Sequence, residues 1–176
     1  MQNPMNTPVV LTIIAKDQPG IVNAVSKILY KHGGGWTQSS MSSLAGQFAG
    51  ILLASVPTRL ADTCVQELQQ LKAQGMTVIA HISDAPAQTQ SCREYTLDLV
   101  GNDRKGIVHD ITTILAKHNI NVQSLETVTE SASMGGAELF RAKAELLVPA
   151  DADIDALEDE LEEIANELMV DITFNN

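Results

Sequence analysis

The fold is decided by LTIIAKDQPGIVNAVSKILYKH, residues 11–32, and by LDLVGNDRKGIVHDITTILAKH, residues 97–118, which align without a gap at a constant offset of 86. Nine of the 22 positions are identical, including a complete D-x-x-G-I-V string and a complete K-H pair in the same register. Internal repeats of this kind are the signature of a duplicated structural unit. The chain is therefore predicted to consist of two related units.

Each copy predicts a strand followed by a helix. Residues 9–15 and 95–101 are apolar runs typical of buried strands. A polar turn with Asp and Gly follows, and then apolar residues recur at the three- and four-residue spacing of a helix with one buried face. Both helices end in Lys-His, which suits the carbonyl-rich end, and are followed by Gly33 or Asn119, which tolerate a left-handed cap.

The remainder of each unit predicts a hairpin, a second helix and a final strand. In the first unit the hairpin strands are 36–44 and 48–56 around Ala45-Gly46-Gln47, and in the second they are 120–129 and 137–148. The second hairpin carries six additional residues around SASMGG. Apolar periods after Pro57 and Pro149 predict the second helices, and 77–82 and 169–174 predict the final strands.

The resulting order is β-α-β-β-α-β twice, an α+β architecture of two tandem ferredoxin-like units. Each unit is expected to form an antiparallel sheet with its helices on one face. The polar segment 84–93 contains Pro86 and has no apolar period, so it is the expected linker between domains 1–83 and 94–176. Because such a sheet leaves one face or an edge uncovered, the two units can use these surfaces against each other or against a second chain, and a homo-oligomer is expected.

Composition narrows the classes of function. Formal net charge is −11, and nine of the 22 acidic residues fall between Asp151 and Glu167, which disfavours direct binding to a phosphate backbone. The acidic run is interpreted as a solvated helix face rather than an interaction tail. Neither a signal peptide nor a membrane-spanning run is recognisable, so a cytoplasmic location without membrane contact is expected.

The two D-x-x-G turns carry a resemblance to a known family. A strand followed by D-Q-P-G-I-V at 17–22, opening an amphipathic helix, resembles the ACT domain, a small regulatory module that binds amino acids in metabolic proteins. The second turn, D-R-K-G-I-V at 103–108, has Lys105 where that family usually has Pro. Two such modules in one short chain resemble the glycine cleavage system transcriptional repressor family.

The resemblance implies an amino-acid sensor rather than an enzyme, with glycine as its ligand. It further implies indirect repression of a glycine cleavage operon through contact with a DNA-binding transcriptional activator. The two units leave no spare segment for a helix-turn-helix, which agrees with an indirect mechanism. The alternatives are an ACT-type subunit that confers feedback control on an amino-acid metabolic enzyme, and a small enzyme built on the same scaffold.

The chemistry of the turns supports a small zwitterionic ligand. A glycine-containing turn that opens a helix presents backbone N–H groups to a carboxylate, and a nearby Asp or Asn oxygen can accept hydrogen bonds from an ammonium group. The alternative is a structural role, in which Asp caps the helix and Gly permits a tight turn or close packing. The candidate ligand-binding residues are Asp17, Gln18, Pro19, Gly20, Ile21, Val22, Asn102, Asp103, Gly106, Ile107 and Val108.

The remaining reactive residue types predict no catalytic, metal or cofactor site. His32, His81, His109 and His118 lack metal-ligand spacing, and His32 and His118 are expected to be cations at helix ends. Cys64 lies on an apolar helix stripe, as a core residue does, and Cys92 forms no C-x-x-C pair with it. Trp36 and Met41 are interpreted as core or interface residues rather than a ligand-facing pair.

Overall fold

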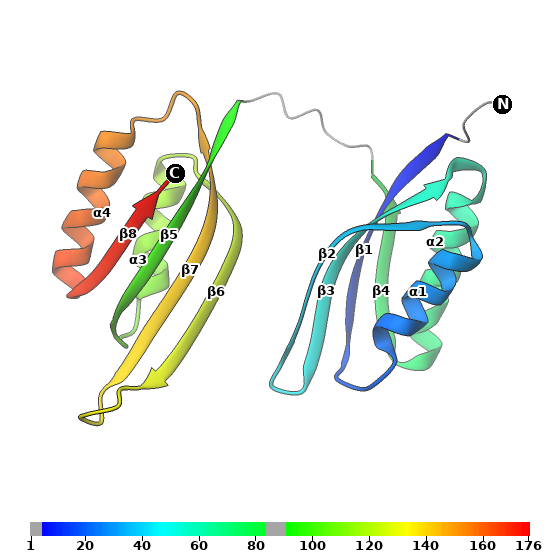
Figure 1. Ribbon diagram of the computed structural model, residues 1–176, viewed down its shortest axis with the longest axis horizontal. Helices are drawn as coiled ribbons and strands as arrows, with labels where there is room; N and C mark the ends of the chain where they lie inside the picture. Colours follow the sequence, from blue (N-terminus) through cyan, green and yellow to red (C-terminus); the bar gives the residue numbers. More distant parts are fainter. Residues whose placement is uncertain (1–4, 84–90) are drawn as a thin grey trace. The chain divides into compact units, whose positions relative to one another are not determined.

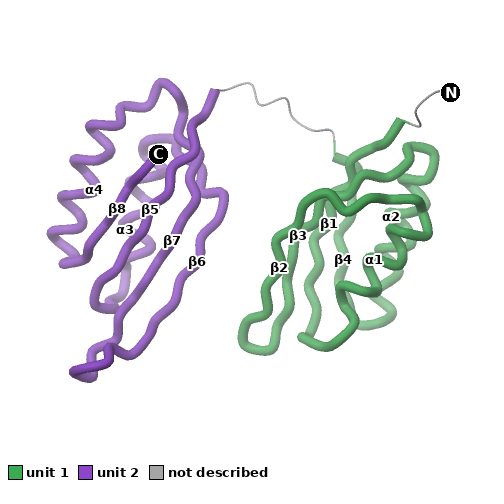
Figure 2. Tube along the Cα trace, in the orientation of Figure 1, with its two compact units in different colours: residues 1–87 green, residues 88–176 purple. Residues whose placement is uncertain are grey.

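The computed structural model describes residues 5–83 and 91–176. The chain divides into two compact units, residues 1–87 and 88–176, which we call unit 1 and unit 2 (Figure 2). The domain limits at 83 and 94 stay a prediction, and residues 84–90 of the expected linker lie outside the described residues. Strand β5 already begins at Cys92, because Cys92 and Arg93 pair with Pro149 and Val148.

Both units have the predicted β-α-β-β-α-β order (Figure 1). The elements of unit 1 are β1 (Asn6–Lys16), α1 (Ile21–Lys31), β2 (Gly35–Leu44), β3 (Gln47–Pro57), α2 (Ala61–Gln69) and β4 (Met76–Ile82). Short 3₁₀ turns, Thr58–Leu60 and Gln70–Gln74, flank α2. The elements of unit 2 are β5 (Cys92–Asn102), α3 (Ile107–Lys117), β6 (Asn121–Ser131), β7 (Glu138–Pro149), α4 (Ile154–Leu168) and β8 (Val170–Asn175).

Each unit contains one four-stranded antiparallel sheet. The strand order is β2-β3-β1-β4 in unit 1 and β6-β7-β5-β8 in unit 2, so the predicted α+β fold is confirmed. Both helices of a unit cover the same face of its sheet (Figure 1). Because alternate side chains of a strand point to opposite faces, half of each sheet's side chains pack beneath the helices and the other half form an open face.

The core of each unit lies between its helices and its sheet. In unit 1 the residues of β1 that face the helices, Val9, Leu11 and Ile13, are completely inaccessible to solvent and pack against Leu52 and Leu68. Unit 2 has a separate cluster that includes Leu97, Leu99 and Leu157. Since each cluster is built from one unit only, each unit has the core it needs to fold by itself.

Charge is divided very unevenly between the two units. Unit 1 contains five Lys and Arg residues against four Asp and Glu, whereas unit 2 contains six against eighteen. The acidic run on α4 forms a solvated face, as predicted, with one exception. Glu160 is half-buried and pairs with Lys117 and His118 of α3. The net charge of −11 therefore belongs essentially to unit 2.

The turns between elements follow the predicted backbone chemistry. Gly33 and Asn119, directly after helices α1 and α3, have positive φ angles of 68° and 57°. Ala45 and Gly46, at the tip of the first hairpin, have φ angles of 49° and 79°, which match the right-handed twist of a two-residue hairpin. The left-handed conformation of Gly33 and Asn119 ends the two helices, and that of Ala45 and Gly46 reverses the chain at the hairpin tip.

Several strand ends differ from the sequence-based prediction by one to three residues, and at two positions the conformation itself differs. Met169 was expected to begin the last strand, but it is the left-handed C-cap of α4, with φ 53°, and the strand begins at Val170. The apolar period that reaches Leu71 was expected to form one helix, but α2 ends at Gln69 and Leu71 reaches the core from a 3₁₀ turn. A period of apolar residues does not distinguish an α-helix from a 3₁₀ turn over so few residues.

No helix among the described residues is long and apolar enough to cross a membrane.

Candidate functional site

The first candidate turn joins β1 to α1 and ends at Gly20. Gly20 has φ 94° in the left-handed region, and a Cβ added to it would meet no atom within 4 Å. Glycine is therefore required here by the backbone angle and not by close packing. The open space in front of Gly20 leaves the start of the helix accessible.

No side chain caps the start of α1. The first intrahelical bond runs from the Ala24 N–H to the Gly20 carbonyl at 2.9 Å, so the N–H groups of Ile21, Val22 and Asn23 precede the helical ladder. The first turn of α1 also contains no acidic residue. The alternative that Asp17 is a helix cap is thus wrong, and the positive end of this helix remains open to an anion.

Asp17 is instead fixed by the tip of the β2–β3 hairpin. The Asp17 N–H donates to the Gly46 carbonyl at 2.9 Å, and the Ser43 hydroxyl donates to the Asp17 carboxylate at 2.6 Å. The Asp17 side chain is exposed, and within residues 5–83 and 91–176 its Oδ1 accepts no hydrogen bond, so this oxygen can still accept one. Sequence reasoning missed Ser43 and Gly46, because nothing in their local pattern indicates that the hairpin tip returns to this turn.

The second candidate turn repeats the backbone of the first. Gly106 has φ 95°, no side chain caps α3, and the Asp103 N–H donates to the Glu138 carbonyl at 2.8 Å. Its surroundings differ, because Asp110 lies in the first turn of α3, where α1 has Ala24. A Cβ on Gly106 would lie 3.6 Å from an Asp110 carboxylate oxygen, so unit 2 already holds a negative group beside the start of its helix.

The remaining sequence candidates fall into two groups. The side chains of Ile21 and Ile107 are buried in the two cores, so only their backbone N–H groups are available at the turns. The other candidates are exposed, and these are Asp17, Gln18, Pro19, Gly20, Val22, Asn102, Asp103, Gly106 and Val108. In unit 2, Arg104 and Lys105 add two exposed cations to the turn, which offset part of the negative charge of Asp103 and Asp110.

Met41 of β2 packs against the core of unit 1, and a small apolar cavity lies within the core of unit 2. A Cβ on Gly50 would lie 2.5 Å from the Cγ of Met41, so Met41 covers this position and packs against the core, as its sequence context suggested. In unit 2 an apolar cavity of about 30 Å³ lies between α3 and the sheet, lined in part by Ile107, Val108 and Leu125. A cavity of this size and polarity is consistent with a packing void that stays dry.

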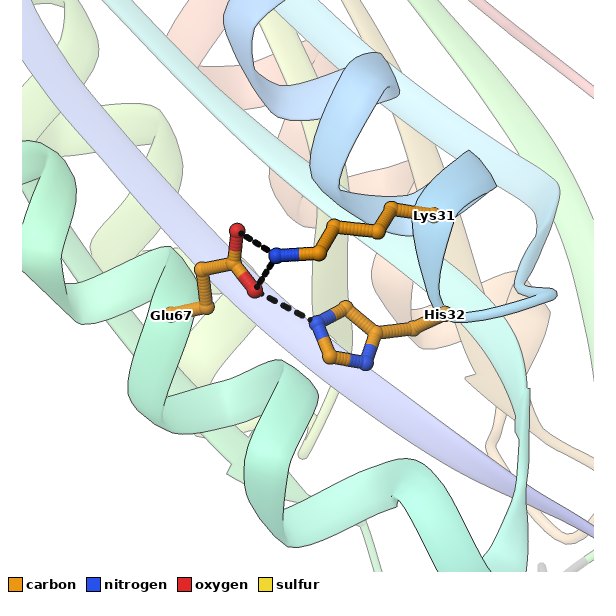
Figure 3. Close-up of polar contacts among 3 residues, drawn as sticks. All are labelled: Lys31, His32 and Glu67. Atoms are coloured by element: carbon orange, nitrogen blue, oxygen red, sulfur yellow. Dashed lines mark hydrogen bonds and ion pairs between the residues drawn. The ribbon is translucent and has the colours of Figure 1, made fainter.

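The Lys-His pair at the end of α1 contacts Glu67 of α2 in unit 1 (Figure 3). The Lys31 ammonium lies 2.9 Å from both oxygens of the Glu67 carboxylate, and His32 Nε2 lies 2.7 Å from one of them. Unit 2 repeats the arrangement, with Lys117 and His118 at 2.8 and 3.2 Å from Glu160. The two histidines are therefore residues of a helix-to-helix clamp, a partnership that sequence spacing alone could not show.

These contacts change the acidity of the two glutamates. Hydrogen bonding by Lys31, and then by His32, lowers the pKa of Glu67, and the same groups of unit 2 lower the pKa of Glu160. A lowered pKa in the folded state means that the carboxylate contributes stability above its unfolded pKa of about 4.3, and that this stability is lost as the pH falls through the folded pKa.

We expect the stability of unit 1 to depend less on pH in the variant Glu67→Gln than in the parent protein. Between pH 7 and pH 3 the melting temperature of unit 1 should fall less in Glu67→Gln than in the parent protein, because the titrating partner of Lys31 is gone. Thermal melts followed by Trp36 fluorescence, the single tryptophan of the chain, measure this. Glu162→Gln, at an exposed position of α4, is the control and should leave the profile of unit 1 unchanged.

The cysteines and the remaining histidines form no reactive cluster in the described part of the chain. Cys64 and Cys92 are both free, and burial, followed by the charge of Glu67, raises the pKa of Cys64 to about 11. Its thiol is therefore protonated at neutral pH, as expected of a core residue. Within residues 5–83 and 91–176 no group of three or more His, Cys, Asp or Glu side chains could hold a metal ion.

The chain is thus a duplicated ferredoxin-like unit with an uncapped, glycine-initiated helix after the first strand of each copy. The ACT domain family matches residues 7–82 and residues 89–167, which together make up most of the chain. The chain therefore belongs to the ACT-domain family, as a tandem of two ACT domains.

Two solved structures are similar to this chain over nearly all of its length. A crystal structure of an unknown protein from Galdieria sulphuraria is 28% identical, with a TM-score of 0.85 over 97% of this chain and 98% of the other. The crystal structure of a "putative glycine cleavage system transcriptional repressor" is 21% identical, with a TM-score of 0.63 over 97% of each chain. No curated protein matches the sequence.

Proposed function

We propose that this protein is a non-enzymatic cytoplasmic sensor of glycine that represses transcription of a glycine cleavage operon through a DNA-binding activator protein. The observation that carries the sensing role is the turn at residues 17–22, where a left-handed Gly20 opens an uncapped helix beside an exposed carboxylate. The α-carboxylate of the ligand would accept hydrogen bonds from the N–H groups at the start of α1. Its ammonium group would donate to Asp17.

Unit 1 is the preferred site for the ligand. The start of α1 carries no acidic residue, whereas Asp110 stands at the start of α3 and would repel a ligand carboxylate. The second turn, with Asn102, Asp103 and Gly106, belongs to the proposal as a weaker site for the same class of zwitterion.

The regulatory step must act through another protein. The charge of unit 2 opposes contact with a phosphate backbone, so the proposed partner is the activator and not the DNA itself. The likeness to a structure described as a "putative glycine cleavage system transcriptional repressor" supports a role in repression. Glycine would shift the repressor between two states only if its affinity for the two states differs.

Calorimetric titration of the purified protein against a panel of amino acids tests the sensing role. The expected result is saturable binding of glycine with weaker binding of amino acids that carry larger side chains. Proteins are typically half-saturated by metabolites at concentrations up to about 1 mM. If no amino acid binds at concentrations up to about 10 mM, ten times that value, the sensing role is wrong.

The second candidate function is a regulatory subunit that gives an amino-acid metabolic enzyme feedback control, since ACT domains occur in many metabolic proteins. Affinity capture from a cell extract of the source organism separates the two functions. Recovery of a transcriptional activator that is released by glycine supports repression. Recovery of a metabolic enzyme without any transcription factor supports the alternative.

A further inference from the structure

The open faces of the two sheets differ in a way that the shared fold does not require. In unit 1 the strand register places twelve side chains on the open face in three rows across β2, β3, β1 and β4. We call this set the neutral face. Its rows are Gln38, Leu53, Val10 and His81; Ser40, Ile51, Thr12 and Ile79; and Ser42, Ala49, Ile14 and Thr77.

The corresponding twelve positions of unit 2 form what we call the charged face. Its rows are Ser124, Glu145, Thr96 and Asn175; Glu126, Lys143, Asp98 and Thr173; and Val128, Arg141, Val100 and Asp171. Six of these twelve residues are Asp, Glu, Lys or Arg. None of the twelve residues of the neutral face is, and His81 is its one titratable group. Two sheets of one fold in one chain thus differ by six charges on equivalent positions.

The neutral face also exposes large apolar side chains to solvent. Ile14, Ile51 and Ile79 are 48%, 58% and 58% exposed, and the last two flank Thr12 in the central row. Open sheet faces normally alternate apolar residues on the core side with polar ones on the solvent side, as unit 2 does. A contiguous apolar patch on such a face marks a surface that is covered in the functional state.

We propose that the neutral face pairs with the neutral face of a second copy of this chain, sheet against sheet. The charge pattern favours this occupant over the other sheet surface available in the protein. Covering Ile51 and Ile79 with a charged face would remove Asp98, Glu126 and Lys143 from water without new partners, which is costly. A second neutral face brings no charges within its three rows, although Lys16 lies one row beyond them on the same face. Unit 1 is close to electrically neutral, so two copies do not repel each other there.

The size of the face sets the strength of the pairing. Four strands about 4.8 Å apart, over the seven residues of β4 at about 3.4 Å each, give a flat area of about 450 Å² per face. The pair would bury about 900 Å², which is below the roughly 1,200–2,000 Å² of stable specific interfaces and in the range of weak, transient ones. The dimer is therefore weak and reversible, and its population depends on protein concentration.

Sedimentation equilibrium of the full chain tests the pairing from about 1 µM to about 1 mM, the range in which a weak interface of this size dissociates. The parent protein is expected to dimerise reversibly within it. Ile79→Asp is expected to raise the dimer dissociation constant at least about a hundredfold, because it buries an unpaired carboxylate. Thr173→Asp is the matched control at the equivalent, exposed position of the charged face and should leave the dissociation constant unchanged.

Mixing two variants identifies which surface the neutral face meets. Ile79→Asp and Ile79→Lys should each be monomeric, with an unchanged circular dichroism spectrum because Ile79 is mostly exposed. An equimolar mixture should recover the dimer only if neutral faces pair with each other. A parent protein that stays monomeric at about 1 mM, a dimer that survives Ile79→Asp or that is lost in Thr173→Asp, or a mixture that stays monomeric would each overturn the proposal.

Discussion

Leu11→Ala is expected to lower the free energy of unfolding of unit 1 by about 2–5 kcal/mol, which corresponds to a fall of at least about 10 °C in its melting temperature. Leu11 lies on the central strand β1, is completely buried, and pairs with Leu52 on one side and Ala80 on the other. Removing its side chain leaves a cavity that the surrounding sheet and helices cannot close. A domain of this size has only about 5–15 kcal/mol of stability in total, so the loss is a large part of it.

Two spectroscopic probes separate the response of the two units. Fluorescence of Trp36 reports on unit 1 alone, whereas circular dichroism reports on both units. Leu97→Ala, the equivalent change in unit 2, should lower part of the circular dichroism transition and leave the Trp36 transition in place. Ile14→Ala, on the open face of β1, is the control for Leu11→Ala and should lower the free energy of unfolding by less than about 1 kcal/mol. A single transition that shifts for both probes in both core variants would contradict independent cores.

Gly20→Ala is expected to weaken glycine binding by at least about tenfold, because it forces an L side chain into a left-handed backbone conformation that costs about 1–2 kcal/mol. The added methyl group would meet no neighbouring atom, so the fold should survive while the start of α1 shifts. Gly33→Ala is a matched control at the other end of α1, with φ 68° and ordinary contact with Pro57. It should lower stability by a similar amount and leave affinity unchanged.

A second variant tests the site without backbone strain. Ala24→Asp places in unit 1 the carboxylate that Asp110 supplies in unit 2, and an acidic residue in the first turn stabilises a helix. Repulsion of about 1–2 kcal/mol between this group and a ligand carboxylate roughly 6 Å away should weaken glycine binding by about tenfold. Calorimetry at low and at high salt measures the change. If Ala24→Asp and the parent protein bind glycine with equal affinity, the ligand carboxylate does not lie at the start of α1.

The sequence repeat was sufficient to predict most of the architecture. The gapless alignment of 22 residues predicted the first strand, the turn and the first helix of both units. Gly33 and Asn119 predicted the ends of these helices, which the structure confirms. The pattern failed where two conformations share one period, as at Leu71 and Met169. Those positions depend on how the chain closes onto its own core, which local residue spacing does not record.

The candidate turns were predictable, but their surroundings were not. The glycine at each turn is visible in the sequence, whereas the partners of Asp17 come from Ser43 and Gly46, more than 20 residues away. Glu67 likewise lies more than 30 residues from the Lys-His pair that it joins. Contacts between distant segments follow from the register of the sheet and the placement of helices on it, so they require the folded structure.

A backbone hydrogen bond links each candidate turn to the hairpin of its unit, but it reaches a different part of the hairpin in the two units. In unit 1 the Asp17 N–H is tied to Gly46, within a tight hairpin tip whose strands pair up to Leu44 and Gln47. In unit 2 the Asp103 N–H is tied to Glu138, where a longer connection separates β6 from β7. A displacement of the first turn would therefore act on two strands that are paired up to their tip, whereas a displacement of the second turn would act on the first residue of β7, next to the longer connection.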